Sequence, residues 1–278
     1  MGKLDGKVAV VTGASMGIGE AIAKLFVEEG ASVMLSSRDA GRAEAARARI
    51  GRPERTMAVA CDVRNREEID RLLSLTLHNF GRVDIWVNNA GHGHIDAVEN
   101  MDMRECRAMF DTNLFGALDG MQVAIAAMRR QGGGTIINIS SVAGWIPMAG
   151  SAGYSATKAA MNYFGRAART ELLGSGINVM TVCPGYIATD FGVNAVKGAQ
   201  ARRVGVAARR GAPVEVVARA TLNGYLKGKR EVVTPWFYVI PMWFYRFFPG
   251  LVEGYMAKHL RPAGEVIAEA QAARHSER

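Results

Sequence analysis

Tyr154 and Lys158 stand four positions apart in the stretch SAGYSATKAAMNYF, residues 151–164. On a helix this spacing places the two side chains on one face. A free phenol has a pKa of about 10, which is too high for acid–base work near neutrality. An ammonium group one helical turn away would stabilise the phenolate and lower that pKa. The pair therefore indicates a general acid or base, although the same spacing also arises by chance.

Other polar residues stand at the ends of apolar runs in the same chain. Ser141 lies thirteen residues before Tyr154, NNAG occupies residues 88–91, and PGYIATD occupies residues 184–190. Asn113 lies in DTNLFG, after the start of a predicted helix. In an open parallel sheet the carboxyl ends of the strands meet at one edge, where ligands bind. We therefore expect these groups to converge with Tyr154.

The elements that must position them alternate along the chain. Seven short apolar runs predict strands, at residues 7–12, 31–37, 56–63, 83–91, 134–141, 177–185 and 231–234. Helix-like runs separate them, the first three at residues 18–30, 38–50 and 66–80. Apolar strands alternating with helices predict a doubly wound α/β fold of the Rossmann type, a parallel sheet with helices on both faces. We predict one such domain over residues 1–235 and a C-terminal extension over residues 236–278.

A glycine-rich turn, TGASMGIG, follows the first predicted strand at residues 12–19. Its glycines stand at positions 13, 17 and 19, which is not the G-x-G-x-x-G spacing of the usual dinucleotide fingerprint. Glycine still lets the backbone turn sharply and lets a pyrophosphate approach closely. The helix that follows would add free N–H groups and a positive dipole end. The turn thus predicts a phosphate site in preference to a plain strand-to-helix connection.

The end of the second predicted strand, where an adenosine ribose would lie, reads Ser36-Ser37-Arg38. Sites that prefer NAD commonly carry a carboxylate there, and the first one here is Asp39. A guanidinium group at Arg38 suits a 2′-phosphate in charge and geometry. We therefore predict NADP over NAD. The alternative is that Arg38 is an exposed first residue of the next helix.

Asp62 follows the third predicted strand in the run CDV. Its carboxylate could accept a hydrogen bond from the adenine amino group. Alternatively, it caps the helix that begins near Asn65.

Taken together, these motifs resemble those of the short-chain dehydrogenase/reductase family, in its single-domain branch. TGASMGIG resembles the family's TGxxxGxG, and NNAG, Asn113, Ser141, Tyr154-x-x-x-Lys158 and PG follow in the family's order and spacing. The resemblance runs from about residue 5 to residue 235, which is most of the chain.

The resemblance implies the interconversion of a ketone and an alcohol, with a hydride supplied by the cofactor. It implies that Tyr154 is the general acid or base and that Lys158 lowers its pKa and holds the nicotinamide ribose. Ser141 would polarise the substrate oxygen, and Asn113 would hold a water that relays protons to Lys158.

The same resemblance implies a set of cofactor-binding residues. They are Gly13, Ser15, Gly17, Ile18, Gly19, Ser37, Arg38, Asp62, Val63, Asn89, Ala90, Gly91, Tyr154, Lys158, Pro184, Gly185, Ile187 and Thr189. Asn89, Ala90 and Gly91 would line the adenine-ribose side. The residues from Pro184 to Thr189 would cover the nicotinamide, with Thr189 on its amide or on the pyrophosphate.

Two alternatives to a dehydrogenase remain at this stage. One is an isomerase or dehydratase of the same fold that keeps its cofactor, and the other is a non-catalytic nucleotide-sensing protein. His92 and His94, in GHGHID, lack a third ligand, so we expect loop or pocket-wall histidines and no metal.

The composition excludes some classes of protein. A formal charge of +8 comes without a nucleic-acid motif, so we expect a solvated basic surface and no nucleic acid as partner. Three cysteines at wide spacing form neither a disulfide framework nor a zinc pattern, which indicates a reducing compartment. With no apolar leader at residues 1–15, we expect a cytoplasmic protein.

The chain ends in an aromatic segment, PWFYVIPMWFYRFFPGLVEGYM, with eight aromatic residues between Trp236 and Phe248. It is too short and too broken by proline to span a bilayer. It could cover the substrate pocket, pack within the core or against a second subunit of a dimer or tetramer, or lie in a membrane interface. In the last case the cations of Lys227, Lys229, Arg230 and Lys258 would face the lipid head groups.

That segment is loosely similar to the C-terminal extensions of family members that oxidise lipids and steroids. The similarity implies a bulky apolar substrate. The polar residues 262–278 are expected to fray.

Overall fold

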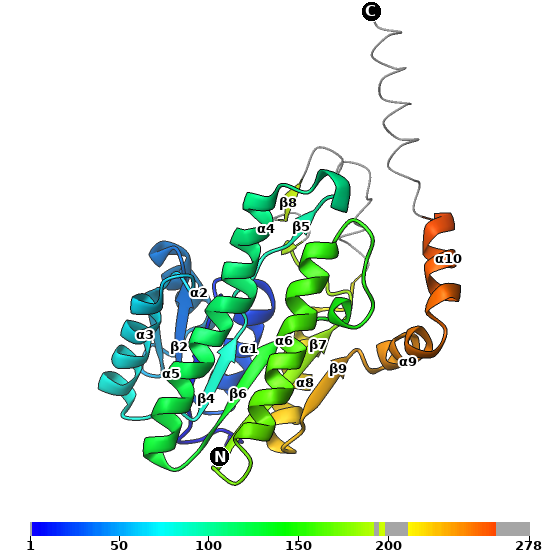
Figure 1. The fold of residues 1–278 in the computed structure, drawn as a ribbon. Helices are drawn as coiled ribbons and strands as arrows, with labels where there is room; N and C mark the ends of the chain where they lie inside the picture. The colour runs from blue at the N-terminus through cyan, green and yellow to red at the C-terminus, as the bar shows by residue number, and fades with distance from the viewer. Residues whose placement is uncertain (1, 192–194, 198–210, 260–278) are drawn as a thin grey trace, which may run out of the picture.

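The computed structural model describes residues 2–191, 195–197 and 211–259. Seven strands form one sheet in the order β3-β2-β1-β4-β6-β7-β9, and each neighbouring pair is parallel (Figure 1). They are β1 (Val8–Val11), β2 (Ser32–Ser37), β3 (Thr56–Ala60), β4 (Ile85–Asn88), β6 (Gly134–Ile139), β7 (Ile177–Pro184) and β9 (Glu231–Thr234). Each falls within one of the seven runs predicted from the sequence, so the predicted fold class is confirmed.

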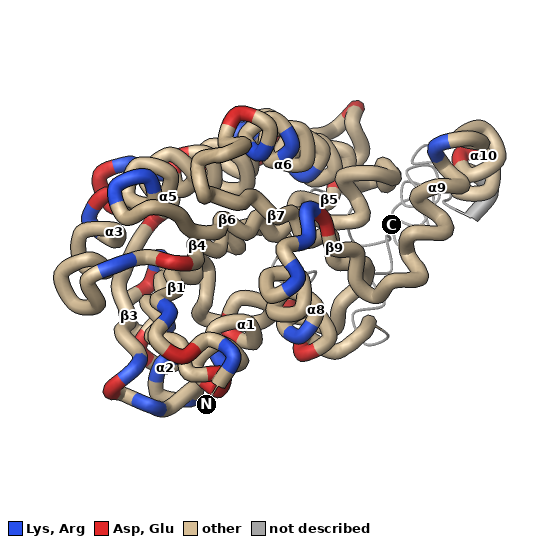
Figure 2. The backbone as a smooth tube through the Cα atoms, turned by 90° about the horizontal axis from the view of Figure 1, so that it is seen from below, with Lys and Arg blue, Asp and Glu red and all other residues tan. Residues whose placement is uncertain are grey.

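Helices cover both faces of this sheet, as Figure 2 shows from below. One face carries α1 (Gly17–Glu28), α2 (Ala40–Ile50) and α8 (Val214–Leu226), and the other carries α3 (Arg66–Phe80), α5 (Gly116–Gln131) and α6 (Ala152–Glu171). Successive side chains of a strand point to opposite faces. Val11 therefore packs in the same buried cluster as Phe26 of α1, whereas Val10 packs with Leu72 of α3. Burial on both faces explains why the central strands are mostly apolar.

The strand order reverses between β1 and β4, which are neighbours at the centre of the sheet. A crevice opens at such a switch point beyond the carboxyl ends of the strands. The glycine turn leaves β1 there, and NNAG leaves β4 there. The fold thus brings the two motifs together.

Several short elements were not predicted from the sequence. A second sheet pairs β5 (His94–Ile95) with β8 (Val196–Lys197), and single turns form η1 (Val98–Asn100) and η3 (Val142–Gly144). A π-helical turn, η2 (Asp111–Phe115), joins α4 (Met103–Phe110) to α5. Elements of two to five residues leave too short a hydrophobic pattern to be recognised.

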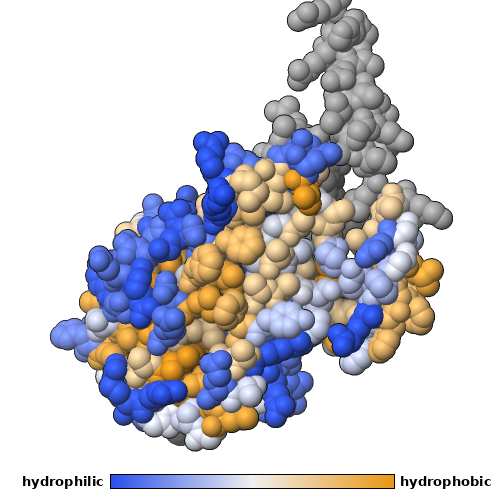
Figure 3. Space-filling model, in the orientation of Figure 1, coloured by the Kyte–Doolittle hydropathy of each residue, from blue (hydrophilic) through white to orange (hydrophobic). Residues whose placement is uncertain are grey.

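After β9 the chain forms η5 (Trp236–Tyr238), α9 (Val239–Phe247) and α10 (Pro249–His259). Figures 1 and 2 both show α9 and α10 projecting past β9, away from the rest of the fold. None of the side chains of η5 and α9 is fully buried, so these two elements are not part of the core. Figure 3 shows hydrophobic residues along the outer side of this projection. Across the described residues, every helix falls short of the length and apolarity that crossing a bilayer requires.

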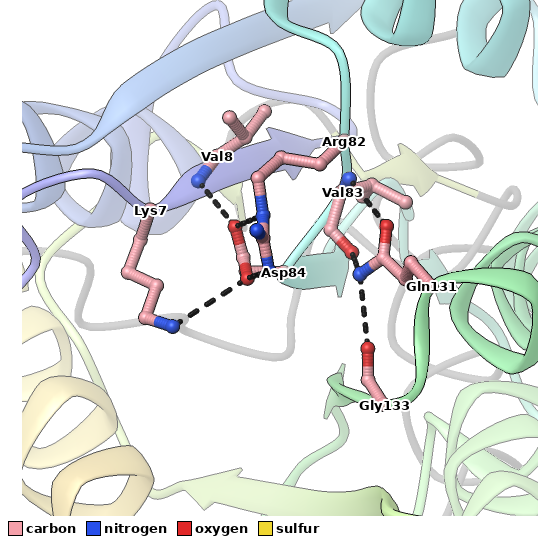
Figure 4. A network of polar contacts seen from close by, with 7 residues as sticks. All are labelled: Lys7, Val8, Arg82, Val83, Asp84, Gln131 and Gly133. Carbon is pink, nitrogen blue, oxygen red and sulfur yellow. Dashed lines mark hydrogen bonds and ion pairs between the residues drawn. The ribbon is translucent and has the colours of Figure 1, made fainter.

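The opposite, amino edge of the sheet is closed by polar contacts (Figure 4). The buried carboxylate of Asp84 accepts from the Val8 N–H at 2.9 Å and from Arg82 Nε and Nη2 at 2.9 and 2.7 Å. The Gln131 amide donates to the Val83 carbonyl oxygen at 2.7 Å and accepts from the Val83 N–H at 3.1 Å. A buried carboxylate is tolerated when it is paired in this way. These contacts stabilise the amino edge of the sheet.

Candidate active site

Tyr154 and Lys158 lie in the first turns of α6. Lys158 is buried, and its Nζ donates to the Ile139 carbonyl oxygen at 2.9 Å and lies 5.7 Å from the centroid of the Tyr154 ring. The Ser141 hydroxyl, just beyond β6, lies close enough to the Tyr154 hydroxyl to lower its pKa. It also donates to the Pro184 carbonyl oxygen at 3.4 Å. The fold thus brings these three predicted catalytic side chains together.

Burial moves the two ionisable groups of α6 in opposite directions. It raises the pKa of Tyr154 to about 12, and the nearby Ser141 hydroxyl offsets only part of that shift. Burial lowers the pKa of Lys158 to about 8, because the charged ammonium loses its hydration. The protein groups alone therefore do not lower the phenol pKa, and its tuning by Lys158 stays a prediction.

Asn113, the fourth predicted catalytic residue, is buried in the π-helical turn between α4 and α5. Its Oδ1 accepts from the His92 N–H at 2.9 Å, and its Nδ2 donates to the His92 carbonyl oxygen at 2.9 Å and to Thr157 Oγ1 at 3.3 Å. Single π-helical turns within helices are frequent at functional sites. The Asn113 amide thus ties the exit of β4 to α6, close to Lys158.

Gly91 lies between these two groups. A Cβ built on Gly91 would stand 3.0 Å from Asn113 Oδ1 and 3.8 Å from Lys158 Nζ. Both polar side chains therefore border the same small volume beside the backbone at Gly91.

The glycine turn is packed directly against the end of β4. A Cβ on Gly13, whose φ is +63°, would lie 2.7 Å from the Ala90 Cα, and one on Gly19 would overlap the Asn89 amide. Asn89 Nδ2 donates to the Gly13 carbonyl oxygen at 3.0 Å. Glycine is required at these positions because the two loops touch through their backbones.

Thr12 holds the same two loops together, and the sequence analysis assigned it no role. Its hydroxyl donates to the Val87 carbonyl oxygen at 3.2 Å and accepts from the N–H groups of Asn89 and Ala90 at 3.0 and 3.2 Å. The structure therefore gives Asn89 and Ala90 a bracing role. Their direct contact with a cofactor stays a prediction.

Helix α1 begins at Gly17, and no side chain caps its start. By contrast, Asp39 caps α2 and Asn65 caps α3. Gly17 has φ +61°, and a Cβ there would meet only the Thr189 side chain, at 3.6 Å. An uncapped helix start behind a glycine turn is a ready site for a phosphate group. Thr189 borders that site.

Arg38 stands between β2 and α2 and is exposed. It precedes the helix, because α2 begins only at Ala40. Asp39 is engaged as a cap, with Oδ1 accepting from the Arg42 N–H at 2.7 Å. Within the described residues, no hydrogen bond or ion pair of 4.0 Å or less engages the Arg38 guanidinium.

Asp62 does not cap the third helix, so that alternative is wrong: Asn65 holds the capping position. The Asp62 carboxylate instead pairs with the Arg64 guanidinium through Nε at 3.0 Å. This pairing, with a further contribution from Arg38, lowers the pKa of Asp62. The Arg64 charge is thus balanced by Asp62, and Arg38 is the cation that the predicted adenosine end could offer to a ligand.

Four other predicted cofactor positions lie along the same edge. Ile18 packs against the core beneath α1, and Val63 is buried at the end of the β3 loop. The Ser15 carbonyl oxygen accepts from Arg49 Nη2 at 3.0 Å, and Ser37 Oγ accepts at 3.4 Å from the N–H two residues on. The contacts that the structure describes for these four residues are with other residues of the chain, and their role in cofactor binding stays a prediction.

The PG motif at the end of β7 is covered by the C-terminal segment. A Cβ on Gly185 would overlap the ring of Tyr238, and the Tyr238 hydroxyl accepts from the Tyr186 N–H at 3.2 Å. Ile187 packs against the core cluster beneath α1. Sequence reasoning missed this role of Tyr238, because nothing in an aromatic run distinguishes one ring from its neighbours.

Phe191 is a second residue that the sequence analysis missed. Its ring centroid lies 5.4 Å from that of Tyr154, and its N–H donates to Thr189 Oγ1 at 3.3 Å. A Cβ on Gly93 would approach the Phe191 ring to 3.1 Å. The only available signal was its place two residues after Thr189. Phe191 forms an apolar wall beside the phenol.

The two histidines of GHGHID lie on this side of the site. His94 is buried in β5, and burial together with the nearby charge of Arg38 lowers the pKa of His92. Among the residues that the structure describes, no group of three or more His, Cys, Asp or Glu side chains could hold a metal ion.

Comparison with known proteins identifies the family. The model of the short chain dehydrogenase family matches residues 7–200. This chain belongs to the short-chain dehydrogenase family. An uncharacterised oxidoreductase of Staphylococcus epidermidis is 36% identical to this short-chain dehydrogenase over 198 residues, which are 69% of this chain and 85% of that protein.

Solved structures agree with the fold of this short-chain dehydrogenase. A short-chain dehydrogenase/reductase from Burkholderia phymatum, in complex with NAD, matches with a TM-score of 0.83 over 90% of this chain and 96% of its own, at 24% identity. A 3-ketoacyl-(acyl-carrier-protein) reductase from Brucella melitensis, complexed with NADH, matches with a TM-score of 0.75 over 84% and 99%, at 27% identity.

This short-chain dehydrogenase is an oxidoreductase that depends on a nicotinamide cofactor. Its residues fit such a group, because the start of α1 follows the glycine turn and is left without a side-chain cap, which suits a phosphate group.

Proposed function

We propose that this short-chain dehydrogenase interconverts a secondary alcohol and a ketone on a hydrophobic substrate, with NADP as its preferred cofactor. The observation that carries the proposal is the nearness of the Ser141 hydroxyl to the Tyr154 hydroxyl, whose pKa it lowers, with buried Lys158 Nζ 5.7 Å from the centroid of the Tyr154 ring. The bound cofactor supplies or accepts the hydride at the substrate carbon. Protein groups must then manage only the proton and the charge on the substrate oxygen.

In the direction of reduction, the Tyr154 hydroxyl gives its proton to the substrate oxygen while the hydride forms the new C–H bond. In oxidation, the phenolate takes that proton back. The Ser141 hydroxyl donates to the substrate oxygen and stabilises the negative charge that develops on it. A substrate oxygen within reach of both hydroxyls satisfies these roles, and the nearness of Ser141 to Tyr154 supports such a position.

Lys158 and Asn113 act behind the phenol in this proposal. The Lys158 ammonium stabilises the phenolate and binds the nicotinamide ribose, and Asn113 supports a water that passes protons to Lys158. Asn113 Oδ1 and Lys158 Nζ both lie next to Gly91, and this closeness supports the relay. Thr189 and the N–H groups at the start of α1 bind the pyrophosphate.

A hydrophobic substrate is supported by the apolar surroundings of the phenol. The Phe191 ring covers one side of Tyr154, and the buried residues Ile95 and Ala195 form a small apolar cluster on the neighbouring strand pair and loop. A panel of ketones and alcohols of increasing apolar bulk tests this assignment by NADPH absorbance. We expect turnover with apolar ketones. If the protein binds the cofactor but turns over no ketone or alcohol of the panel, the proposal is wrong.

The preference for NADP rests on this chain's own residues, since the two solved structures named above contain NAD and NADH. Asp39, the first carboxylate after β2, caps α2 and is therefore engaged away from a ribose. The Arg38 guanidinium is exposed, whereas the charge of Arg64 is balanced by Asp62. A 2′-phosphate would gain from the charge of Arg38.

Replacing Arg38 tests the cofactor preference. Arg38→Ala should raise the Kd of NADPH about 10- to 100-fold, the effect of losing a hydrogen-bonded charge, and should leave the Kd of NADH within about threefold. Arg42→Ala, an exposed arginine in the first turn of α2, is the matched control and should change neither constant. Equal losses for the two cofactors would remove the 2′-phosphate assignment.

We further propose that residues 1–235 form the catalytic domain, residues 236–278 an extension, and that the chain forms a homo-oligomer. The end of the last strand at Thr234 supports the boundary. The final residues, 260–278, lie outside the described part of the chain, as do the arginines at positions 202, 203, 209 and 210.

A further inference from the structure

Helix α9 exposes the side that a surface helix normally buries. Ile240, Trp243, Phe244 and Phe247 follow the spacing i, i+3, i+4, i+7, which forms one stripe of a helix. These four side chains are between 46% and 65% exposed. In a helix of a globular protein such a stripe faces the core. Here it faces away from the protein.

The neighbouring elements extend this stripe into a larger surface. Trp236 of η5, Phe248 at the junction, and Leu251 and Tyr255 of α10 are exposed as well. The rings of Trp243 and Phe247 stack with centroids 5.8 Å apart, so the large side chains of the stripe pack on one another instead of on the core. We call these eight side chains the C-terminal apolar surface; Figure 3 shows hydrophobic residues along this part of the molecule.

The C-terminal apolar surface lies near the active-site edge. It begins where β9 leaves the sheet at its carboxyl end, the edge that holds the catalytic residues. Tyr238 fixes its first turn against Gly185 and the Tyr186 N–H of the PG loop. An object bound to this surface would therefore stand beside the site.

We propose that the C-terminal apolar surface binds the interface of an anionic lipid bilayer, with α9 and α10 lying in the plane of the membrane. Two short helices broken at Pro249 cannot span a bilayer but can lie in its interface. Tryptophan and tyrosine are the residues enriched at the level of the lipid head groups. The side chains available, two tryptophans, a tyrosine and three phenylalanines among them, match that environment.

Charge favours lipid over a second copy of this chain. The formal charge of +8 attracts the protein to an anionic surface but opposes contact with a second copy here, so the proposed homo-oligomer would form through another face. Helix α9 contributes Arg246 and no acidic residue. Glu253 is the sole acidic residue of η5, α9 and α10, and its carboxylate accepts from the Tyr245 hydroxyl at 3.0 Å. The surface therefore presents little negative charge to oppose anionic lipid.

Three of the cations expected to face the head groups do not belong to this surface. Lys227, Lys229 and Arg230 lie before β9, at its amino end, whereas the C-terminal apolar surface starts beyond its carboxyl end. Attraction to lipid therefore comes from the overall charge and from Arg246, and the apolar side chains supply the anchoring.

Vesicle co-sedimentation of the full chain tests this proposal. Wild-type protein should sediment with vesicles of phosphatidylcholine containing about one quarter phosphatidylglycerol, and less with phosphatidylcholine alone or at high salt. The double variant Trp243→Ser/Phe247→Ser should lower the partition coefficient at least about tenfold, because two anchoring rings are removed. Its NADPH affinity and circular dichroism spectrum should match those of the wild type, which shows that the fold is intact.

The matched control removes two other exposed apolar side chains. Val98→Ser/Leu173→Ser changes residues that are 74% and 72% exposed outside this surface, and should leave vesicle binding unchanged. Wild-type protein that stays in the supernatant with both vesicle types overturns the proposal. A second result would also overturn the proposal. If the wild type is a dimer by sedimentation velocity, if the Trp243→Ser/Phe247→Ser variant is a monomer, and if neither binds vesicles, then a second copy covers the surface. Neither readout depends on the reaction that the enzyme performs.

Discussion

Tyr154→Phe is expected to lower kcat by about 10²- to 10⁴-fold in both reaction directions, the contribution typical of a positioned general acid or base. The substitution removes one oxygen and leaves the ring in contact with Phe191. It also removes the hydroxyl proton of Tyr154, so the substrate oxygen loses its proposed proton donor. The Kd of NADPH should change by less than about threefold, because phenylalanine fills the same volume. Steady-state kinetics and cofactor titration measure the two quantities.

Tyr163→Phe is the matched control for this variant. Tyr163 lies on the same helix, α6, but is 72% exposed, so its hydroxyl should be dispensable for activity. If Tyr154→Phe kept wild-type kcat, the catalytic assignment would fail and a nucleotide-binding protein without this chemistry would remain. If it lost NADPH binding as well as activity, the tyrosine would act on the cofactor site instead of on the proton.

The sequence predicted the sheet well, for a physical reason. A strand buried on both faces must be apolar along its length, and this chain marks every such strand with glycine or a polar turn at its end. The strands Val8–Val11 and Ile85–Asn88 are short, but their apolar runs and the turns that follow made them recognisable. The strand pair β5–β8 escaped prediction because two residues cannot show a pattern.

The site was predictable where chemistry requires a particular residue type. The sequence allowed us to predict candidate site residues that carry a group or a backbone freedom that few residues offer. These are Tyr154, Lys158, Ser141 and the glycine turn. Thr12, Phe191 and Tyr238 could not, since hydroxyls and rings are common and their roles come from contacts between loops distant in the chain. The uncapped start of α1 was likewise visible only once the caps of its neighbours were known.

Lys158→Met is expected to move the pH dependence of both reaction directions upward by at least about two pH units. In the wild type, the Lys158 pKa of about 8 lies below the Tyr154 pKa of about 12, so the doubly protonated pair loses its first proton near pH 8. Reduction needs the phenol and the ammonium together, so its rate should fall as the pH rises through 8. Oxidation needs the pair with one proton removed and the phenolate formed, so its rate should rise over the same range.

In the variant only the phenol remains to titrate. Burial holds its pKa at about 12, and the removed ammonium can no longer stabilise the phenolate. Reduction should therefore be slow but independent of pH through 8, and oxidation should appear only at strongly alkaline pH. Methionine is unbranched like lysine and fills the buried space, so the fold should persist.

Lys24→Met, at an exposed lysine of α1, controls for the loss of one positive charge and should keep the wild-type profile. A Lys158→Met enzyme with an unchanged profile would mean that the ammonium does not govern the phenol, and the acid–base role would have to rest on Tyr154 and Ser141 alone.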